Sequence, residues 1–191
     1  MRTLRSLGLA GLLLGLVVSV AQAQETAKHR GFWIGVGLGG GWNLSNTING
    51  DTRGGGGFVL RMGGSPSERW LIGGEILAFG TSEGDVDFGR GNVTLTVMHY
   101  LNVPRGVFLK AGVGGAGFTT FTSSTVGNTT TTVTTNDSGF GTNAGIGWDV
   151  RLARNFYLTP ALDFAYQRVS VDDIGTVNNT MVLFTVAATW H

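Results

Sequence analysis

The sequence contains no cysteine, and only three of its 191 residues are proline. A chain without cysteine has no disulfides, so packing and backbone pairing must supply its stability. Charged residues make up 13% of the chain, about half the share that is usual in soluble domains, and the mean hydropathy is +0.17. This composition is unlike that of a protein surrounded by water.

Long apolar runs are also absent, except at the start of the chain. Residues 7–20 form an uncharged apolar segment, which follows two arginines and precedes the small-residue site Ala21 to Ala23. This order is typical of a secretory signal peptide, and the apolar run is shorter than the roughly 20 residues that a membrane-spanning helix needs. We predict a signal peptide over residues 1–23 and one mature domain over residues 24–191.

Neither sign of charge dominates the predicted mature chain. Without the two arginines of the signal, eleven basic residues face twelve acidic ones, which excludes a simple basic nucleic-acid binder. Glycines and polar residues interrupt every later apolar run, so no spanning helix is expected after the signal. If the mature chain crosses a membrane, it must do so as a closed sheet, because only helices and closed sheets satisfy the backbone in lipid.

Glycine is abundant, with 33 residues, and it alternates with large apolar residues along several segments. Successive side chains of a strand point to opposite faces, so each such segment has one apolar face and one nearly bare face. The same alternation recurs over residues 139–150 and 182–190. The alternation begins in the segment that follows the predicted signal. It carries Phe32, Ile34, Val36 and Leu38 on its apolar face, separated by Trp33, Gly35 and Gly37.

Eight such segments can be marked, and most have the length of a tilted strand that crosses a bilayer. Three short and four long connections alternate between them, which is typical of bacterial barrels with short periplasmic turns and long outer loops. The sequence therefore predicts an all-β fold, an eight-stranded antiparallel up-and-down transmembrane β-barrel with both termini in the periplasm. The predicted strands cover residues 31–42, 56–64, 70–79, 91–101, 107–118, 139–151, 156–167 and 179–190.

A soluble secreted barrel is the structural alternative. Its apolar face would have to point inward, but the interior of an eight-stranded barrel is only just wide enough for ordinary side chains. Large apolar residues from all eight strands would overfill it, whereas glycine and threonine fit. The volume argument favours the membrane barrel.

Charged side chains also occur on the inward phase of the predicted strands. Buried charges must be paired, so we predict a diagonal cross-strand pair between Arg61 and Glu75 and a second pair between Lys110 and Asp149. Such a network could plug the barrel, or a ring of charges could line a narrow water path. The inward charges are Arg61, Glu75, Lys110, Asp149 and Asp163.

The remaining motifs carry little chemistry. Gly35 to Gly40 and Gly112 to Gly117 match the dinucleotide pattern, but no helix follows either of them to hold a pyrophosphate. The three histidines have no metal-ligand spacing, and no serine shares an inward phase near His99. We therefore predict no catalytic residue, no cofactor and no metal site.

Two further features concern the barrel ends. The long connections hold seven acidic residues against three arginines, and the third of them, residues 119–138, is rich in threonine. That tract is either a flexible loop or an extended hairpin, and we favour the hairpin. Amphipathic rings prefer the membrane interfaces, so we predict five interface anchors: Trp33, Trp42, Trp70, Trp148 and Trp190.

These features together resemble the small bacterial outer-membrane β-barrel proteins, a group that includes the OmpA transmembrane domain, OmpX and the opacity proteins. In that group the assembly machinery reads the last strand, and this resemblance implies an assembly signal in Phe184, Val186 and Trp190, although His191 follows the terminal aromatic. It also implies the bacterial outer membrane as location. The expected partners are outer-membrane lipid, lipopolysaccharide and the general export and assembly machinery.

Function follows less directly, because members of the group share no single activity. We expect a non-enzymatic barrel for envelope structure or for cell-surface interaction through its long outer loops, with an extracellular partner unknown. A narrow channel for small solutes or ions is the alternative, and a lipid-modifying enzyme is a third possibility.

Overall fold

The computed structural model describes residues 31–46, 52–83, 86–126, 129–171 and 175–191. The predicted signal peptide, residues 1–23, lies outside the described residues. Within the described ranges, no helix is long and apolar enough to cross a membrane.

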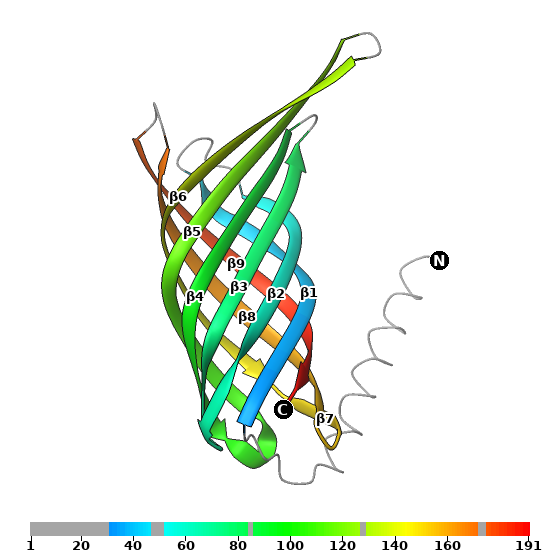
Figure 1. The fold of residues 1–191 in the computed structure, drawn as a ribbon, viewed down its shortest axis with the longest axis vertical. Coiled ribbons are helices and arrows are strands. Elements are labelled where there is room, and N and C mark those ends of the chain that lie inside the picture. Colours follow the sequence, from blue (N-terminus) through cyan, green and yellow to red (C-terminus); the bar gives the residue numbers. More distant parts are fainter. Residues whose placement is uncertain (1–30, 47–51, 84–85, 127–128, 172–174) are drawn as a thin grey trace, which may run out of the picture.

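One antiparallel sheet closes on itself around the whole molecule (Figure 1). The strands follow the order β6-β5-β4-β3-β2-β1-β9-β8, and β8 pairs back with β6. The short β7 continues β6 along the edge of β8, in the same register. The ring therefore has eight strands, as predicted. The segments are β1 Gly31–Asn46, β2 Arg53–Ser67, β3 Trp70–Glu83, β4 Val86–Asn102, β5 Val107–Val126, β6 Thr129–Trp148, β7 Val150–Ala153, β8 Phe156–Val171 and β9 Gly175–Trp190.

The interruption between β6 and β7 falls beside Pro160 of β8, which the shared register places opposite Trp148 and which has no backbone N–H to donate to the ladder. A 3-10 turn, η2 (Val103–Arg105), joins β4 to β5 and ends at Gly106, whose φ of 71° is left-handed and favours glycine. The Gly106 carbonyl accepts the backbone N–H of Asp149 at 2.9 Å. This bond continues the β5–β6 pairing by one residue beyond Val107 and Trp148. The turn thus holds Asp149 at the end of the barrel where the chain ends, which we call the terminal end.

The strands extend further than predicted at the opposite end, which we call the hairpin end. The pairing of β5 with β6 continues until Val126 meets Thr129, so the threonine-rich tract forms an extended hairpin. Pairing of β6 with β8 stops at Ser138, and pairing of β5 with β4 stops at Thr122. The end of the β5–β6 hairpin therefore projects past its neighbours (Figure 1). Threonine favours strands, which agrees with the continued pairing.

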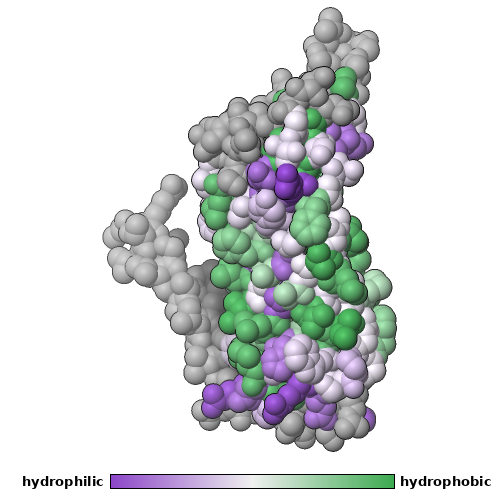
Figure 2. Space-filling model, turned by 90° about the vertical axis from the view of Figure 1, so that its left-hand side faces the viewer, coloured by the Kyte–Doolittle hydropathy of each residue, from purple (hydrophilic) through white to green (hydrophobic). Residues whose placement is uncertain are grey.

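The two faces of the wall differ as the alternation predicts. Leu38, Val93 and Leu95 are 69%, 64% and 63% exposed on the outside, whereas Leu77 and Leu183 are fully buried inside. Figure 2 shows apolar side chains over the middle of the wall, with hydrophilic ones gathered toward both ends. An apolar belt between polar ends matches a bilayer and contradicts the soluble alternative.

Large side chains fill the interior to a greater extent than predicted, and inward glycines make room for them. A Cβ at Gly55 would lie 2.7 Å from Cζ of Phe79, and one at Gly147 would collide with the Phe108 ring. Outward glycines have no such neighbours: nothing lies within 4 Å of a Cβ built at Gly74. Glycine is thus a packing requirement on the inner face only.

Two adjacent glycines of β3 test this difference. A Cβ built at Gly73 would collide with the Met62 carbonyl of β2, whereas nothing lies within 4 Å of a Cβ built at Gly74. We expect Gly73→Ala to lower the free energy of unfolding by about 1–3 kcal/mol, the usual cost of overpacking. Gly74→Ala is the matched control and should stay close to the parent chain in urea titrations of the refolded protein. Equal losses in both variants would contradict the packing argument.

Candidate functional site in the barrel interior

The interior is organised in layers that can be followed along β3. Leu71 belongs to an apolar cluster near the terminal end of the barrel, and Leu77 and Phe79 belong to a second cluster toward the hairpin end. Glu75 lies between the two, 1% exposed. A layer of charged side chains therefore crosses the interior between two apolar layers.

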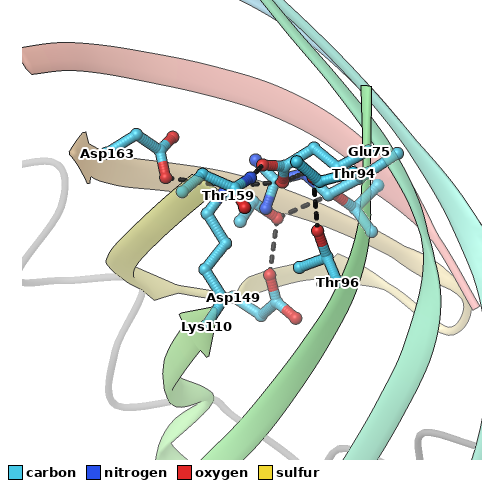
Figure 3. A network of polar contacts seen from close by, with 10 residues as sticks. Glu75, Thr94, Thr96, Lys110, Asp149, Thr159 and Asp163 are labelled. Carbon is cyan, nitrogen blue, oxygen red and sulfur yellow. Dashed lines mark hydrogen bonds and ion pairs between the residues drawn. The ribbon is translucent and has the colours of Figure 1, made fainter. Parts of the chain in front are cut away.

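Glu75 is the centre of this charged layer (Figure 3). Its Oε2 accepts a hydrogen bond from Nζ of Lys110, and its Oε1 accepts one from Nδ2 of Asn143. Lys110 Nζ also lies 2.7 Å from Oδ1 of Asp163, and Arg61 Nε lies 4.0 Å from Glu75 Oε2. Two cations and two carboxylates thus form a neutral group, as burial of charge requires.

Glycine again makes this geometry possible. Gly145 of β6 stands between Lys110 and Asp163 in the sheet. A Cβ there would collide with Oδ1 of Asp163 and lie 3.1 Å from Cε of Lys110. A Cβ at Gly112, which lies opposite Asn143 in the sheet, would collide with Oδ1 of that asparagine. The long polar side chains of the charged layer therefore pass over glycine positions of the inner face.

Arg61 lies directly opposite Glu75 in the ladder, where a diagonal arrangement was predicted. The predicted pairing of Lys110 with Asp149 is wrong. Lys110 pairs in register with Gly145, and Asp149 follows four residues later, about 13 Å along the strand. The lysine therefore reaches Asp163 across the adjacent glycine.

Asp149 belongs to a second polar group near the terminal end. Its carboxylate accepts hydrogen bonds from the Tyr100 hydroxyl and from Thr159 Oγ1, the latter at 2.5 Å. Nε2 of His191 lies 3.6 Å from the same carboxylate. The last residue thus folds into the barrel end, next to the carboxylate that the turn at Gly106 holds in place.

A third polar group lies toward the hairpin end and consists of side-chain amides. Gln167 donates to Oδ1 of Asn92 at 2.7 Å and to the Gly91 carbonyl at 2.9 Å. Asn179 donates to Oε1 of Gln167 at 3.1 Å, and Asn92 donates to the Thr142 carbonyl at 3.0 Å. We call Asn92, Gln167 and Asn179 the amide belt, because they link β4, β8 and β9 across the interior.

The structure thus places all five predicted inward charges inside the barrel, each no more than 4% exposed. Sequence reasoning missed Asn143 and the amide belt, although the signal was present. These residues share the inward phase of their strands, and the prediction considered only charged side chains.

The predicted role of Trp33 as an interface anchor is wrong. Phe32 is exposed on the outer wall, so Trp33 must point inward, where it is 1% exposed and donates from Nε1 to the Gly64 carbonyl at 3.3 Å. The other four predicted anchors follow the outward phase: Trp42, Trp70, Trp148 and Trp190. Their function as anchors remains a prediction.

The residues of the predicted assembly signal occupy the outer wall of β9. Phe184, Val186 and Trp190 are 52%, 37% and 46% exposed, and Trp190 packs against Phe156 with ring centroids 4.9 Å apart. Their reading by an assembly machinery remains an expectation. Among the described residues, no three His, Cys, Asp or Glu side chains gather in a way that could hold a metal ion.

A closed eight-stranded sheet with an apolar outer belt and a filled, charge-balanced interior defines a small transmembrane β-barrel of the bacterial outer membrane. The chain belongs to the outer membrane protein beta-barrel domain family, whose sequence model matches residues 10–189. The resemblance inferred from the strand pattern is thereby confirmed. No curated protein matches the sequence significantly.

Solved structures show the same fold at low sequence identity. Ail, the attachment invasion locus protein of Yersinia pestis, is 16% identical with a TM-score of 0.59, over 85% of this chain and 99% of that one. Neisserial surface protein A is 12% identical with a TM-score of 0.54, over 83% and 96% of the two chains. A major outer membrane protein from Thermus thermophilus is 13% identical with a TM-score of 0.53, over 83% and 98%.

The charged layer leads to a stability prediction. Glu75→Gln removes the carboxylate that Lys110 and Arg61 face, and it leaves an excess of buried positive charge. We expect a loss of about 3 kcal/mol in the free energy of unfolding, as for other broken buried pairs. Asp87→Asn, on the exposed face of β4, is the control and should change little. Urea titration of the refolded variants measures both, and an unchanged Glu75→Gln would show that the layer is not a structural network.

Proposed function

We propose that this chain is a non-enzymatic outer-membrane barrel that acts at the cell surface through its hairpins, with the hairpin end outside the cell and both termini in the periplasm. The observation that carries the proposal is the β5–β6 hairpin. β6 leaves β8 at Ser138, β5 stays paired with β4 up to Thr122, and the hairpin continues to the pair of Val126 with Thr129. Its end therefore projects beyond the closed part of the ring and presents a surface of its own. Long outer loops and short periplasmic turns are the rule in bacterial barrels.

The hairpin exposes apolar side chains beyond the closed part of the ring, which ends where β6 leaves β8. Phe121 is 41% exposed and Val133 is 59% exposed. Thr119 and Asn136, next to them, hydrogen bond to each other at 2.9 Å across the two strands. A paired, partly apolar ribbon suits contact with another macromolecule, because its backbone is already ordered and binding costs little entropy.

The filled interior argues against the channel alternative. The charged layer, the amide belt and two apolar clusters follow one another along the axis, and each buried charge of the central layer has an opposite charge beside it. An eight-stranded barrel has little room for water in addition to such side chains. We therefore place the function on the outer surface of the protein and not in its bore.

One of the similar solved structures is a complex with a ligand. Ail has been crystallised in complex with the heparin analogue sucrose octasulfate, and that complex has a TM-score of 0.54 to this chain. The long connections of this chain hold seven acidic residues against three arginines. A polyanion would be repelled by them, so we favour a neutral or basic partner surface.

Shortening the hairpin tests the proposal. Thr120 pairs with Thr135, so residues 121–134 can be replaced by Asn-Gly, which closes a two-residue hairpin without a change of register. We expect cells that make the shortened protein to lose most of their adhesion to polystyrene coated with lysozyme, a basic protein. Cells with the full-length protein should adhere well above cells without it.

Heat-modified migration on gels, compared between the two proteins, controls for barrel folding and amount. Equal adhesion by both kinds of cell, or no adhesion above cells without the protein, would overturn the proposal.

A further inference from the structure

Arginine is concentrated in the three turns at the terminal end of the barrel. The turn between β2 and β3 holds Arg69, the turn between β4 and β5 holds Arg105, and the turn between β7 and β8 holds Arg154, all three exposed. Arg151 of β7 adds a fourth positive charge, and Glu68 is the only acidic residue of these turns. Four arginines against one glutamate leave a net charge of +3. The predicted mature chain has one acidic residue in excess, so this positive charge is local.

The backbone carbonyl of the arginine in each turn accepts a hydrogen bond from elsewhere in the barrel end. In chain order of the turns, the donors are the backbone N–H of Tyr100 at 2.9 Å, Nε1 of Trp148 at 2.6 Å and Nη2 of Arg151 at 3.1 Å. The backbone of each turn is therefore already fixed. Only the arginine side chain has to be ordered when a partner binds, which keeps the entropic cost low.

Outward aromatic side chains lie beside the same three turns. Trp70 follows the first turn and packs against His99, with ring centroids 4.2 Å apart. Trp148 is bonded to the second turn, and Phe156 follows the third and contacts Trp190. Amphipathic rings prefer the headgroup level of a bilayer, and Figure 2 shows hydrophilic side chains gathered below the apolar belt at this end. The arginines therefore stand at the level of the lipid phosphates.

The spacing of the turns favours small headgroups with a single charge. Adjacent turns of this end are two strand positions apart around the ring, which is at least about 10 Å. Each arginine therefore meets a headgroup of its own. A guanidinium group matches a phosphate in shape and charge, and basic residues next to a membrane attract anionic lipids. A zwitterionic headgroup is attracted less, because its own ammonium group cancels the charge of its phosphate.

We propose that the three turns of the terminal end each bind the headgroup of one anionic phospholipid. The phosphate lies on Arg69, Arg105 or Arg154, and the acyl chains lie on the apolar wall next to the outward aromatic side chains. These sites select the phospholipid neighbours of the barrel in the leaflet at its terminal end. They do not depend on the surface role of the β5–β6 hairpin.

Native mass spectrometry of the refolded chain in a nonionic detergent tests the proposal, because it counts the lipids that stay bound to each molecule. Phosphatidylglycerol is the anionic probe, and phosphatidylcholine with the same acyl chains is its zwitterionic counterpart. We expect three molecules of phosphatidylglycerol to bind, each about fivefold more tightly than phosphatidylcholine. This factor corresponds to the usual contribution of one basic residue at a membrane surface.

Substitutions at the turns show whether the arginines carry this preference. Arg69→Gln, Arg105→Gln and Arg154→Gln should each remove one of the three preferential sites, and the triple variant should bind both lipids equally. Arg168→Gln is the matched control, because Arg168 is an exposed arginine near the hairpin end, and it should keep all three sites. Heat-modified migration on gels confirms that each variant is folded.

Three results would overturn the proposal. They are equal affinity of the parent chain for the two lipids, a preference for phosphatidylglycerol that survives in the folded triple variant, and a loss in Arg168→Gln as large as in the single variants of the turns. If the triple variant fails to fold, the three single variants and the comparison of the two lipids on the parent chain still decide.

Discussion

A closed sheet of eight strands leaves a bore just wide enough for side chains, and that limit governs the rest of this structure. Each inward position holds either a side chain that fills the bore or a glycine that gives room to one from another strand. Gly147 faces Phe108, and Gly145 lies under the bridge from Lys110 to Asp163. The glycine content of the chain is thus the counterpart of its large inward residues, and both follow from the strand number.

The same limit explains why the interior charges are balanced. Side chains at the middle of such a bore have little water around them, so a charge there needs an opposite charge or several hydrogen bonds. Glu75 has both, from Lys110 and Asn143, with Arg61 at 4.0 Å. Asp149 obtains its hydrogen bonds from Tyr100 and Thr159. Packing and electrostatics therefore lead to the same result, an interior filled by paired charges and packed side chains.

The alternation of the sequence predicts the strand number, the up-and-down order and the inward phase of the five charges, because period two is a local property of each strand. It does not predict which charges meet. Lys110 reaches Asp163 and not Asp149 because barrel closure sets the register between β5, β6 and β8, a property of the whole ring. Trp33 shows the opposite error: an aromatic near a strand end suggested an anchor, although the phase of Phe32 already assigned it to the interior.

Paired charges and packed side chains fill the bore of this barrel, and a bore filled in this way should not conduct ions. Recording of current across a planar lipid bilayer, with the refolded chain inserted and the number of inserted molecules counted by a fluorescent label, tests it most directly. A filled bore predicts a silent membrane in potassium chloride at every holding voltage. Regular unitary current steps that increase in number with the inserted protein would contradict it and would establish the narrow channel instead.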